Sequence, residues 1–272
     1  MGTRTVLTTL SRDRVLLAYV ALAFAFSWAW WVPVAVAGGT ASHYPGLLGP
    51  LAAAVVVTLA TDGSAGLRRM VGGVGAPRWW ALALSPLLVG AVAAVLAHAF
   101  GNGPSTAELA DMPGVPAWSW PAVFLVVLLV GGVGEEAGWR GLAWPRLRRH
   151  WTLRDAALLL TVPWAVWHLP LFWIDSGLAD MPLYVVPGWL VGLASGAVVL
   201  GWLYERSSSL AVVALAHTAI NLASGTRGGA GLVAAAVSAA VIAAAVLVLR
   251  AESSRGPRTQ PSPGPEIRPP GR

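Results

Sequence analysis

Eight long apolar stretches constrain this chain more than any other feature of its sequence. They cover residues 15–37, 45–61, 79–100, 117–134, 155–174, 183–204, 208–224 and 228–249. Most approach or exceed the roughly 20 residues that an α-helix needs to cross a bilayer. Because backbone polar groups inside lipid must bond within their own segment, such stretches predict helices. We therefore expect an all-α polytopic membrane protein, a bundle of about eight transmembrane helices.

The charged residues are too few for a soluble protein of this length. They make up 11% of the 272 residues, whereas 56% are hydrophobic; soluble domains carry about 25% charged residues. No basic stripe interleaves with aromatic residues, so we expect the lipid bilayer, and no nucleic acid, as a partner. The absence of cysteine excludes disulfides, thiolate metal ligands and a cysteine nucleophile.

The arginines predict the orientation of the bundle. All 18 basic residues are arginine, and all but Arg227 lie in the N-terminal segment, 62–78, 135–154, 205–209 or the C-terminal tail. These regions alternate with the other connections. By the positive-inside rule, both termini are then cytoplasmic. A basic set made only of arginine is typical of GC-rich genomes and favours a bacterial origin. Together with the apolar stretches, it predicts an integral, multi-pass protein of a bacterial plasma membrane.

The domain organisation follows from these stretches. Residues 1–250 are expected to form the transmembrane bundle, and 251–272, with six prolines and no apolar run, a disordered Pro/Arg-rich cytoplasmic tail. The stretch 15–37 is too long for the roughly 7–15 apolar residues of a signal peptide, so we interpret it as a retained helix. Gly188, Gly192 and Gly196 share one helical face, which predicts close helix packing.

Ionisable residues inside the apolar stretches mark a candidate site, because charged groups in lipid are costly. They belong to three short patterns. In each pattern two residues are four positions apart, so they share one helical face. The patterns are Glu135, Glu136 and Arg140 at the end of 117–134, Trp164 and His168 in 155–174, and His217 and Asn221 in 208–224.

These residue types suit hydrolysis of a peptide bond without a covalent intermediate. A carboxylate near two imidazoles can take a proton from water. An asparagine and one histidine can donate hydrogen bonds to the oxyanion of a tetrahedral intermediate.

The three patterns together resemble the CAAX prenyl protease and bacteriocin-processing family of intramembrane endopeptidases, also called the Abi family. That family carries Glu-Glu-xxx-Arg, Phe-xxx-His and His-xxx-Asn on successive membrane helices. The first and third motifs match here, whereas the second has Trp164 where the family has phenylalanine. The resemblance covers about 117–224, which we expect to be the catalytic core.

The resemblance implies a role for each residue. Glu135 would activate water together with His168, and His217 and Asn221 would stabilise the oxyanion. Glu136 and Arg140 would organise the site. The substrate would be a peptide or protein with a membrane-proximal cleavage site.

Metal dependence stays open at this point. Glu135, His168 and His217 could supply three zinc ligands with one open position, as in catalytic zinc sites. Members of the family are commonly called metalloproteases. A glutamate-activated water accounts for the same residues without a cofactor.

Two other functions are compatible with the same residues. One is a non-catalytic bacteriocin-immunity or peptide-sequestering membrane protein. The other is a proton-coupled transporter, which is less favoured because the two halves lack a matching pair of broken helices. The chain has no His-Glu-x-x-His, no Gly-x-Ser-Gly and no aspartate pair within the stretches, which disfavours other intramembrane proteases.

The depth of the site yields a structural prediction. If 155–174 starts at the cytoplasmic surface, His168 lies about 20 Å deeper at ~1.5 Å per residue. Glu135 at the end of 117–134 would be too shallow to meet it. We therefore expect the helix that carries Glu135 to run at least to Arg140, with the glutamates facing a water-filled cavity. We assign no role to His43, His98 or His150, and interpret the arginines at 146–149 as a topology signal.

Overall fold

The computed structural model describes residues 13–116 and 119–254. The described residues form helices joined by turns and loops, and they contain no β-strand apart from one isolated bridge between Gly72 and Ser209. The α-helices are α2 (Arg14–Val36), α3 (Tyr44–Leu47), α4 (Gly49–Val71), α5 (Pro77–Ala99), α6 (Thr106–Ala110), α7 (Trp120–Val126), α8 (Gly134–Gly138), α9 (Trp144–Leu147), α10 (Leu153–Trp167), α11 (Val186–Ser207), α12 (Leu210–Ser224) and α13 (Leu232–Ser253). The π-helical segments are η1 (Val127–Val133) and η2 (Trp139–Ala143), and the 3₁₀ segments are η3 (Leu169–Trp173) and η4 (Leu183–Val185).

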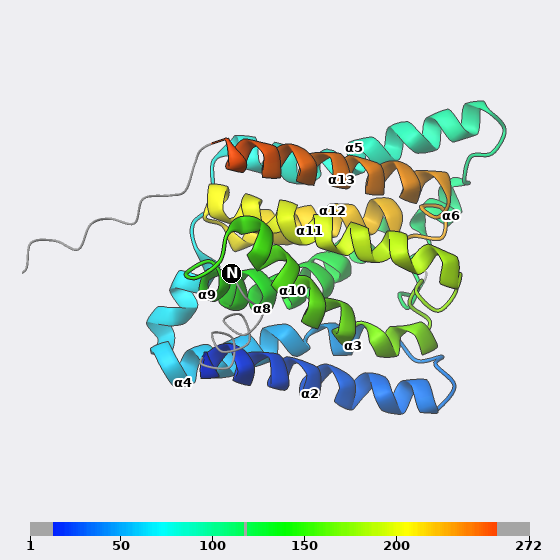
Figure 1. The fold of residues 1–272 in the computed structure, drawn as a ribbon. Helices are drawn as coiled ribbons and strands as arrows, with labels where there is room; N and C mark the ends of the chain where they lie inside the picture. The colour runs from blue at the N-terminus through cyan, green and yellow to red at the C-terminus, as the bar shows by residue number, and fades with distance from the viewer. Residues whose placement is uncertain (1–12, 117–118, 255–272) are drawn as a thin grey trace, which may run out of the picture.

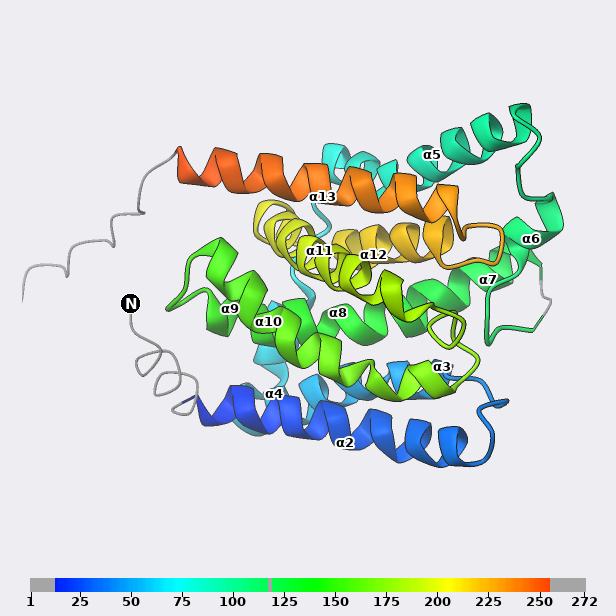
Figure 2. The same cartoon turned by 45° about the vertical axis from the view of Figure 1, so that its right-hand side comes forward.

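The helices confirm the predicted all-α polytopic membrane fold. Within the described residues, seven helical spans are long and apolar enough to cross a membrane, and α12 is a shorter apolar helix. They run roughly along one direction, and α2 begins at the same end of the bundle at which α13 ends (Figures 1 and 2). That arrangement agrees with an even number of crossings, and the side on which both ends lie stays a prediction.

The short helix α12 lies inside the bundle (Figure 2). Eleven of its fifteen residues are buried. It packs against α5 on one side and against η1 and α8 on the other. Because neighbouring helices rather than lipid surround α12, it does not have to reach both membrane surfaces.

The fourth span is longer than its hydropathy predicts. It is helical from Trp120 to Leu147, so its predicted end at residue 134 is wrong and most of the predicted 135–154 connection is helix. Hydropathy falls at Glu135 because the residues there are charged. The helix continues nevertheless, because other helices bury the glutamates and Arg140 and keep them out of water. The prediction that this helix continues at least to Arg140 is confirmed.

The second span is also longer than predicted. It runs from Tyr44 to Val71 instead of ending at residue 61. Gly63, with φ 62° and ψ −161°, interrupts the helix within it. Only glycine adopts this conformation readily, so the chain turns there and the charged residues that follow continue as a polar helical segment.

Two π-helical segments flank the helix that carries the glutamates. They insert extra residues per turn into the fourth span on either side of α8. Such insertions rotate the following residues around the helix axis and are frequent at functional sites.

The glycine face of α11 does not pack as predicted. A Cβ atom added at Gly188, Gly192 or Gly196 would meet no heavy atom within 4 Å. The prediction of close helix packing along this face is therefore wrong, although Gly196 itself is buried.

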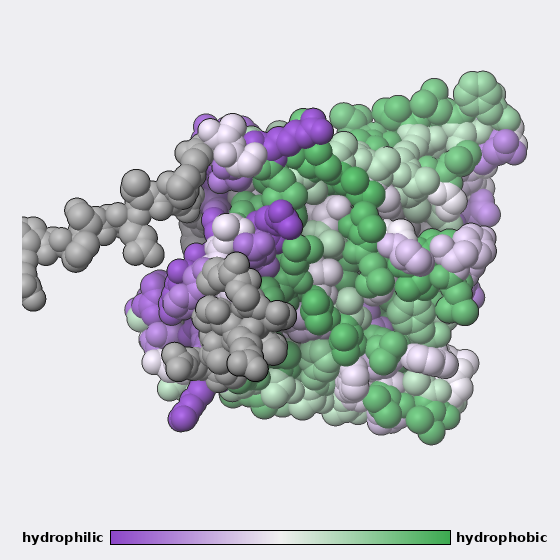
Figure 3. Space-filling view, viewed as in Figure 1, coloured by the Kyte–Doolittle hydropathy of each residue, from purple (hydrophilic) through white to green (hydrophobic). Residues whose placement is uncertain are grey.

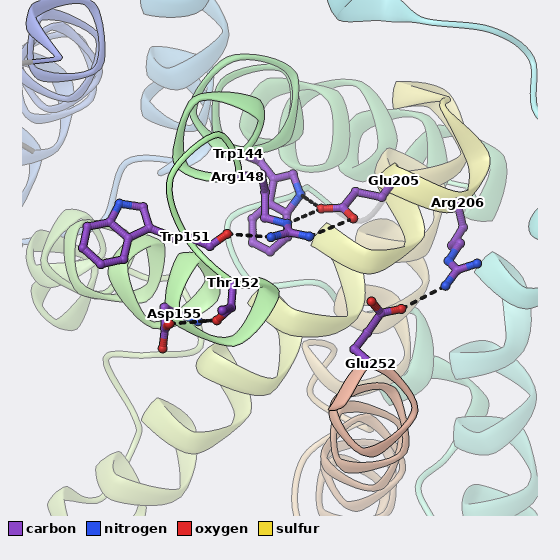
Figure 4. Close-up of polar contacts among 8 residues, drawn as sticks. All are labelled: Trp144, Arg148, Trp151, Thr152, Asp155, Glu205, Arg206 and Glu252. Atoms are coloured by element: carbon purple, nitrogen blue, oxygen red, sulfur yellow. Dashed lines mark hydrogen bonds and ion pairs between the residues drawn. The ribbon is translucent and has the colours of Figure 1, made fainter. Parts of the chain in front are cut away.

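Most of the strongly hydrophilic surface lies at one end of the bundle, with a smaller amount at the other end, and hydrophobic residues cover its body (Figure 3). At the charged end, Arg148 pairs with Glu205 of α11 and donates to the carbonyl of Trp151 (Figure 4). Arg206 pairs with Glu252 of α13 at 2.9 Å. Arg148, expected to be only a topology signal, thus also ties the α9–α10 connection to α11.

The predicted tail falls almost entirely outside the described residues. Helix α13 runs to Ser253, so the first three residues of the predicted tail are helical. Residues 255–272 are not described.

Candidate active site

Three elements in the middle of the bundle carry the predicted site residues (Figure 2). Glu135 and Glu136 lie on α8, and Arg140 lies on η2 directly after it. Trp164 is on α10, and His168 caps its C-terminus, directly before the 3₁₀ segment η3, which contains Pro170. His217 and Asn221 lie one turn apart on α12.

The depth of these residues agrees between the helices. Glu135 lies 12 residues before Leu147, the end of its span, which is about 18 Å along the helix axis. His168 lies 15 residues after Leu153, which is about 22 Å. The extension of the fourth span thus removes the mismatch that the predicted boundary at 134 would cause.

Glu136 connects two of the three motifs. Its Oε1 accepts a hydrogen bond of 2.8 Å from Nη1 of Arg140 and one of 2.7 Å from Nδ1 of His217. The side chains of Glu136 and Arg140 have no exposed surface. Removing two charges from water is costly, so this pair persists only because each charge compensates the other. The arrangement fits the organising role predicted for Glu136 and Arg140.

Trp164 connects Glu135 to the rest of the cluster. Its indole Nε1 donates a hydrogen bond of 2.8 Å to Oε2 of Glu135. The guanidinium of Arg140 lies over the indole ring at 4.3 Å. The rings of His168 and His217 lie 6.0 and 5.8 Å from it. The residue that departs from the family motif therefore contacts at least one residue of each of the three motifs.

The protonation pattern of both histidines follows from their Nδ1 partners. Nδ1 of His168 lies 2.7 Å from the carbonyl oxygen of Trp164, which can only accept a hydrogen bond. Nδ1 of His217 faces the carboxylate that also binds Arg140. Each Nδ1 therefore carries a proton, and Nε2 of each ring is the nitrogen available for chemistry.

Aromatic rings enclose His168. Trp167 and Trp189 contact its ring edge-on, with centroid separations of 4.8 and 5.6 Å. Trp167 is itself fixed by a hydrogen bond of 2.8 Å from Nε1 to Oγ of Ser27 on α2. The rings orient the imidazole and limit its contact with the surroundings.

Asn221 lies beside the glycine-rich η1. Its Nδ2 is 3.9 Å from the position that a Cβ on Gly131 would take. At Gly132 a Cβ would lie only 2.5 Å from Oγ1 of Thr218, so only glycine lets η1 approach α12 this closely. The close approach places Asn221 next to the helix that leads into Glu135.

The sequence analysis missed several residues around this cluster. Within the described chain, some buried side-chain atoms have no hydrogen-bond partner: Tyr19 Oη, Trp139 Nε1, Thr218 Oγ1, Glu136 Oε2, and Nε and Nη2 of Arg140. Buried polar atoms of this kind gather at functional sites. Tyr19 comes from the first span, and its hydroxyl in an apolar stretch was the signal that could have pointed to it.

The wet cavity expected around the glutamates is closed in this structure. Glu135 is 3% exposed and Glu136 is fully buried. His217 is 7% exposed, whereas His168 retains partial exposure. Asn221 is also partly exposed, so His168 and Asn221 are the site residues most open to an approaching substrate.

The predicted metal ligands do not come together as a metal site. In residues 13–116 and 119–254, no three His, Asp or Glu side chains are close enough to hold an ion. The Glu136 carboxylate is already shared by an arginine and a histidine, and Arg140 adds a positive charge beside Glu135. Glu135, His168 and His217 thus do not fit a three-ligand zinc centre in this arrangement.

The remaining histidines lie apart from the cluster. His43 sits between α2 and α3, where its Nδ1 lies 2.9 Å from the backbone oxygen of Asp175. Burial lowers the pKa of His43, and the hydrogen bond to Asp175 opposes that shift in part. Among the described residues, no hydrogen bond or ring contact joins His43 to the predicted site residues.

Comparison with known proteins supports the family resemblance that the three motifs indicate. Residues 117–223 match the family of type II CAAX prenyl endopeptidases, Rce1-like. This is the family that the motifs predict. The matched segment starts before α7 and ends in α12, so it contains all six predicted site residues.

One curated relative matches the same amount of chain. CAAX prenyl protease 2 of Methanococcus maripaludis is 25% identical over 107 residues. The match covers 38% of this chain and 39% of the relative. The chain thus matches less than half of the relative's length, and α2 to α5 and α13 lie outside the residues that match the family.

Proposed function

We propose that this protein is an intramembrane endopeptidase of the CAAX-processing type. The observation that carries the proposal is the contact of Trp164 with Glu135, Arg140, His168 and His217, which joins all three motifs at one depth in the bundle. The match of residues 117–223 to the type II CAAX endopeptidases supports it independently.

In the proposed mechanism, Glu135 and His168 activate the attacking water. The carboxylate of Glu135 accepts a proton from water while the Trp164 N–H holds its other oxygen in place. His168 presents Nε2 as a second acceptor, since Nδ1 is committed to the Trp164 carbonyl. The proton then passes to the leaving amine. Because water is the nucleophile, no covalent intermediate forms.

His217 and Asn221 stabilise the oxyanion of the tetrahedral intermediate. The Glu136 carboxylate on Nδ1 favours a protonated His217, whose Nε2–H then donates to the developing charge. The Asn221 amide supplies a second donor from the next turn of α12. Arg140 holds the Glu136 carboxylate in position.

The substrate in this proposal is a peptide or protein with a cleavage site close to the membrane. Residues about 20 Å from the charged end of the helices reach only segments that enter the bilayer or an opening of the bundle. We place the protein in a bacterial plasma membrane, with both termini cytoplasmic.

Mass spectrometry of membrane-associated peptides tests this function. Membranes with the wild-type protein should contain cleavage products that are absent with His217→Ala, because the variant lacks the oxyanion donor. His150→Ala, which changes a histidine outside the site, is the matched control and should leave the products unchanged.

The same experiment separates the competing functions. Identical peptide profiles for wild type and His217→Ala would overturn the proposal. A peptide-sequestering protein would retain an intact bound peptide in both. A transporter would instead show substrate uptake into proteoliposomes that Glu135→Gln abolishes, with no peptide cleaved.

A further inference from the structure

An apolar groove runs along the opposite side of the bundle from α2 and α4. It lies between α5, α11, α12 and α13 and has a volume of about 390 Å³. Residues such as Leu82, Val89, Trp202, Val241, Ala244 and Leu247 line it. None of the six predicted site residues is among its lining residues, so we call it the α5–α13 groove and treat it separately.

The α5–α13 groove is long and follows the helices. Its lining residues on α13 extend from Val237 to Ala251, which spans about 21 Å at ~1.5 Å per residue. The hydrocarbon core of a bilayer is roughly 30 Å thick. A groove of this length and direction has the shape of an extended chain lying parallel to the membrane lipids.

Local sequence explains why the groove is hollow. Pro86 within α5 cannot donate to the carbonyl of Leu82, and the Ser85 hydroxyl donates to that carbonyl at 2.7 Å instead. Both Ser85 and Pro86 line the groove. On the facing helix, Ala240 and Ala244 are small and leave space. The hollow is therefore built into both helices.

Arginines surround one end of the groove. The ring of Trp202, which lines the groove, packs edge-on against Trp79 at 5.7 Å. The guanidinium of Arg78 lies 4.9 Å from the Trp79 ring, and that of Arg206 lies 5.9 Å from the Trp202 ring. Arg250 is in the last turn of α13, next to the lining residue Ala251.

The charges at this end are positive in sum. Glu252 pairs with Arg206 (Figure 4), so this end carries the three arginines Arg78, Arg206 and Arg250 and one glutamate. The space-filling view shows the hydrophilic end of the bundle directly beside the hydrophobic body (Figure 3). Paired tryptophans at such a boundary are typical of the membrane interface.

We propose that the α5–α13 groove binds an anionic phospholipid. One acyl chain lies in the apolar groove, and the phosphate headgroup lies against Arg78, Arg206 and Arg250. An apolar channel with a cationic end matches the two chemically different parts of such a lipid. A flat helical face of a second copy would fill neither the narrow groove nor the arginine cluster.

Native mass spectrometry of the full-length protein, released from nanodiscs, tests the proposal. The nanodiscs contain equal amounts of phosphatidylglycerol and phosphatidylcholine with the same acyl chains. The wild type should retain phosphatidylglycerol in preference. Arg78→Gln should lower that preference about fivefold, since an arginine near an anionic headgroup contributes ~1 kcal/mol.

A second pair of variants tests the groove itself. Ala244→Trp places an indole in the groove and should abolish lipid retention. Ala243→Trp adds the same side chain at the neighbouring exposed position and should retain the lipid. If Ala244→Trp does not fold, the arginine variants decide the question.

Three results would overturn the proposal. Equal retention of both lipids by the wild type would exclude the arginines as a headgroup site. Full retention by a folded Ala244→Trp would place the lipid elsewhere. Release of a dimer whose formation depends on Ala244 would show that a second copy covers the groove.

Discussion

The Trp164 indole donates a 2.8 Å hydrogen bond from Nε1 to Oε2 of Glu135. Phenylalanine, the residue that the family motif has at this position, cannot make this bond because it carries no donor. The bond fixes one oxygen of the carboxylate, and in the proposed mechanism the other oxygen acts on water. Trp164 is therefore more than an enlarged aromatic side chain and belongs to the proposed active site.

Trp164→Phe should retain the fold and lower the rate of peptide cleavage. Loss of a hydrogen bond to a charged group costs about 1.5–3 kcal/mol, so the rate should fall by a factor of about 10 to 100. Single-turnover cleavage measures this effect. Trp28→Phe, which loses a comparable N–H bond to the Trp167 carbonyl, is the control and should cleave at a nearly normal rate. An unchanged rate in Trp164→Phe would mean that the bond to Glu135 has no role in the chemistry.

Arg140→Gln should destabilise the protein strongly. It leaves the Glu136 carboxylate buried with His217 as its remaining partner. Breaking a buried ion pair from one side costs about 3–5 kcal/mol. Thermal unfolding in detergent measures the loss. Arg227→Gln removes an arginine that is about half exposed and paired with Asp111, and should cost about 1 kcal/mol or less. Equal melting temperatures for the two variants would contradict the buried pair.

Gly138→Ala and Gly188→Ala should have opposite effects on stability. A Cβ at Gly138 would lie 2.2 Å from the Tyr19 hydroxyl and 2.7 Å from the backbone oxygen of Pro50. A Cβ at Gly188 would meet nothing within 4 Å, so helix propensity should stabilise that variant by up to ~1 kcal/mol. Comparing melting temperatures decides the point. A Gly138→Ala protein as stable as the wild type would show that α2 does not approach α8 this closely.

His43 should make the protein less stable in acid. Burial lowers its pKa in the folded state, so the unfolded chain takes up a proton first as the pH falls. The stability that neutral His43 provides is complete above its unfolded pKa of about 6.5 and is lost as the pH falls through the lower folded value. His43→Gln should therefore show a smaller fall in melting temperature between pH 7.5 and pH 5. His150→Gln, at an exposed position, should behave like the wild type. Parallel curves for His43→Gln and the wild type would refute this role of His43.

Hydropathy was sufficient to predict the bundle but not the ends of its helices. The apolar stretches at 79–100 and 208–224 became α5 and α12 within a few residues. Hydropathy failed at Glu135 because charged residues that neutralise one another can continue a helix inside the protein. The depth argument succeeded there, since it used the geometry of two helices rather than the local sequence.

The site was predictable in its residues but not in its contacts. A spacing of four residues predicted that His217 and Asn221 share one helical face, and that Glu136 and Arg140 share another. It could not show that Glu136 binds His217 across helices, because that contact depends on the rotation set by the π-helical segments. The hydroxyl of Tyr19 in an apolar stretch was a signal, but nothing in the local sequence of the first span reveals which helix Tyr19 faces.

Single-turnover hydrolysis by the purified protein tests the central claim most directly. The peptide identified from membranes is incubated with wild type, Glu135→Gln and the control Glu108→Gln, whose glutamate caps the exposed helix α6. If Glu135 is the general base, Glu135→Gln should cleave at least about 100-fold more slowly than the other two. Cleavage by folded Glu135→Gln at the wild-type rate would contradict the proposed active site.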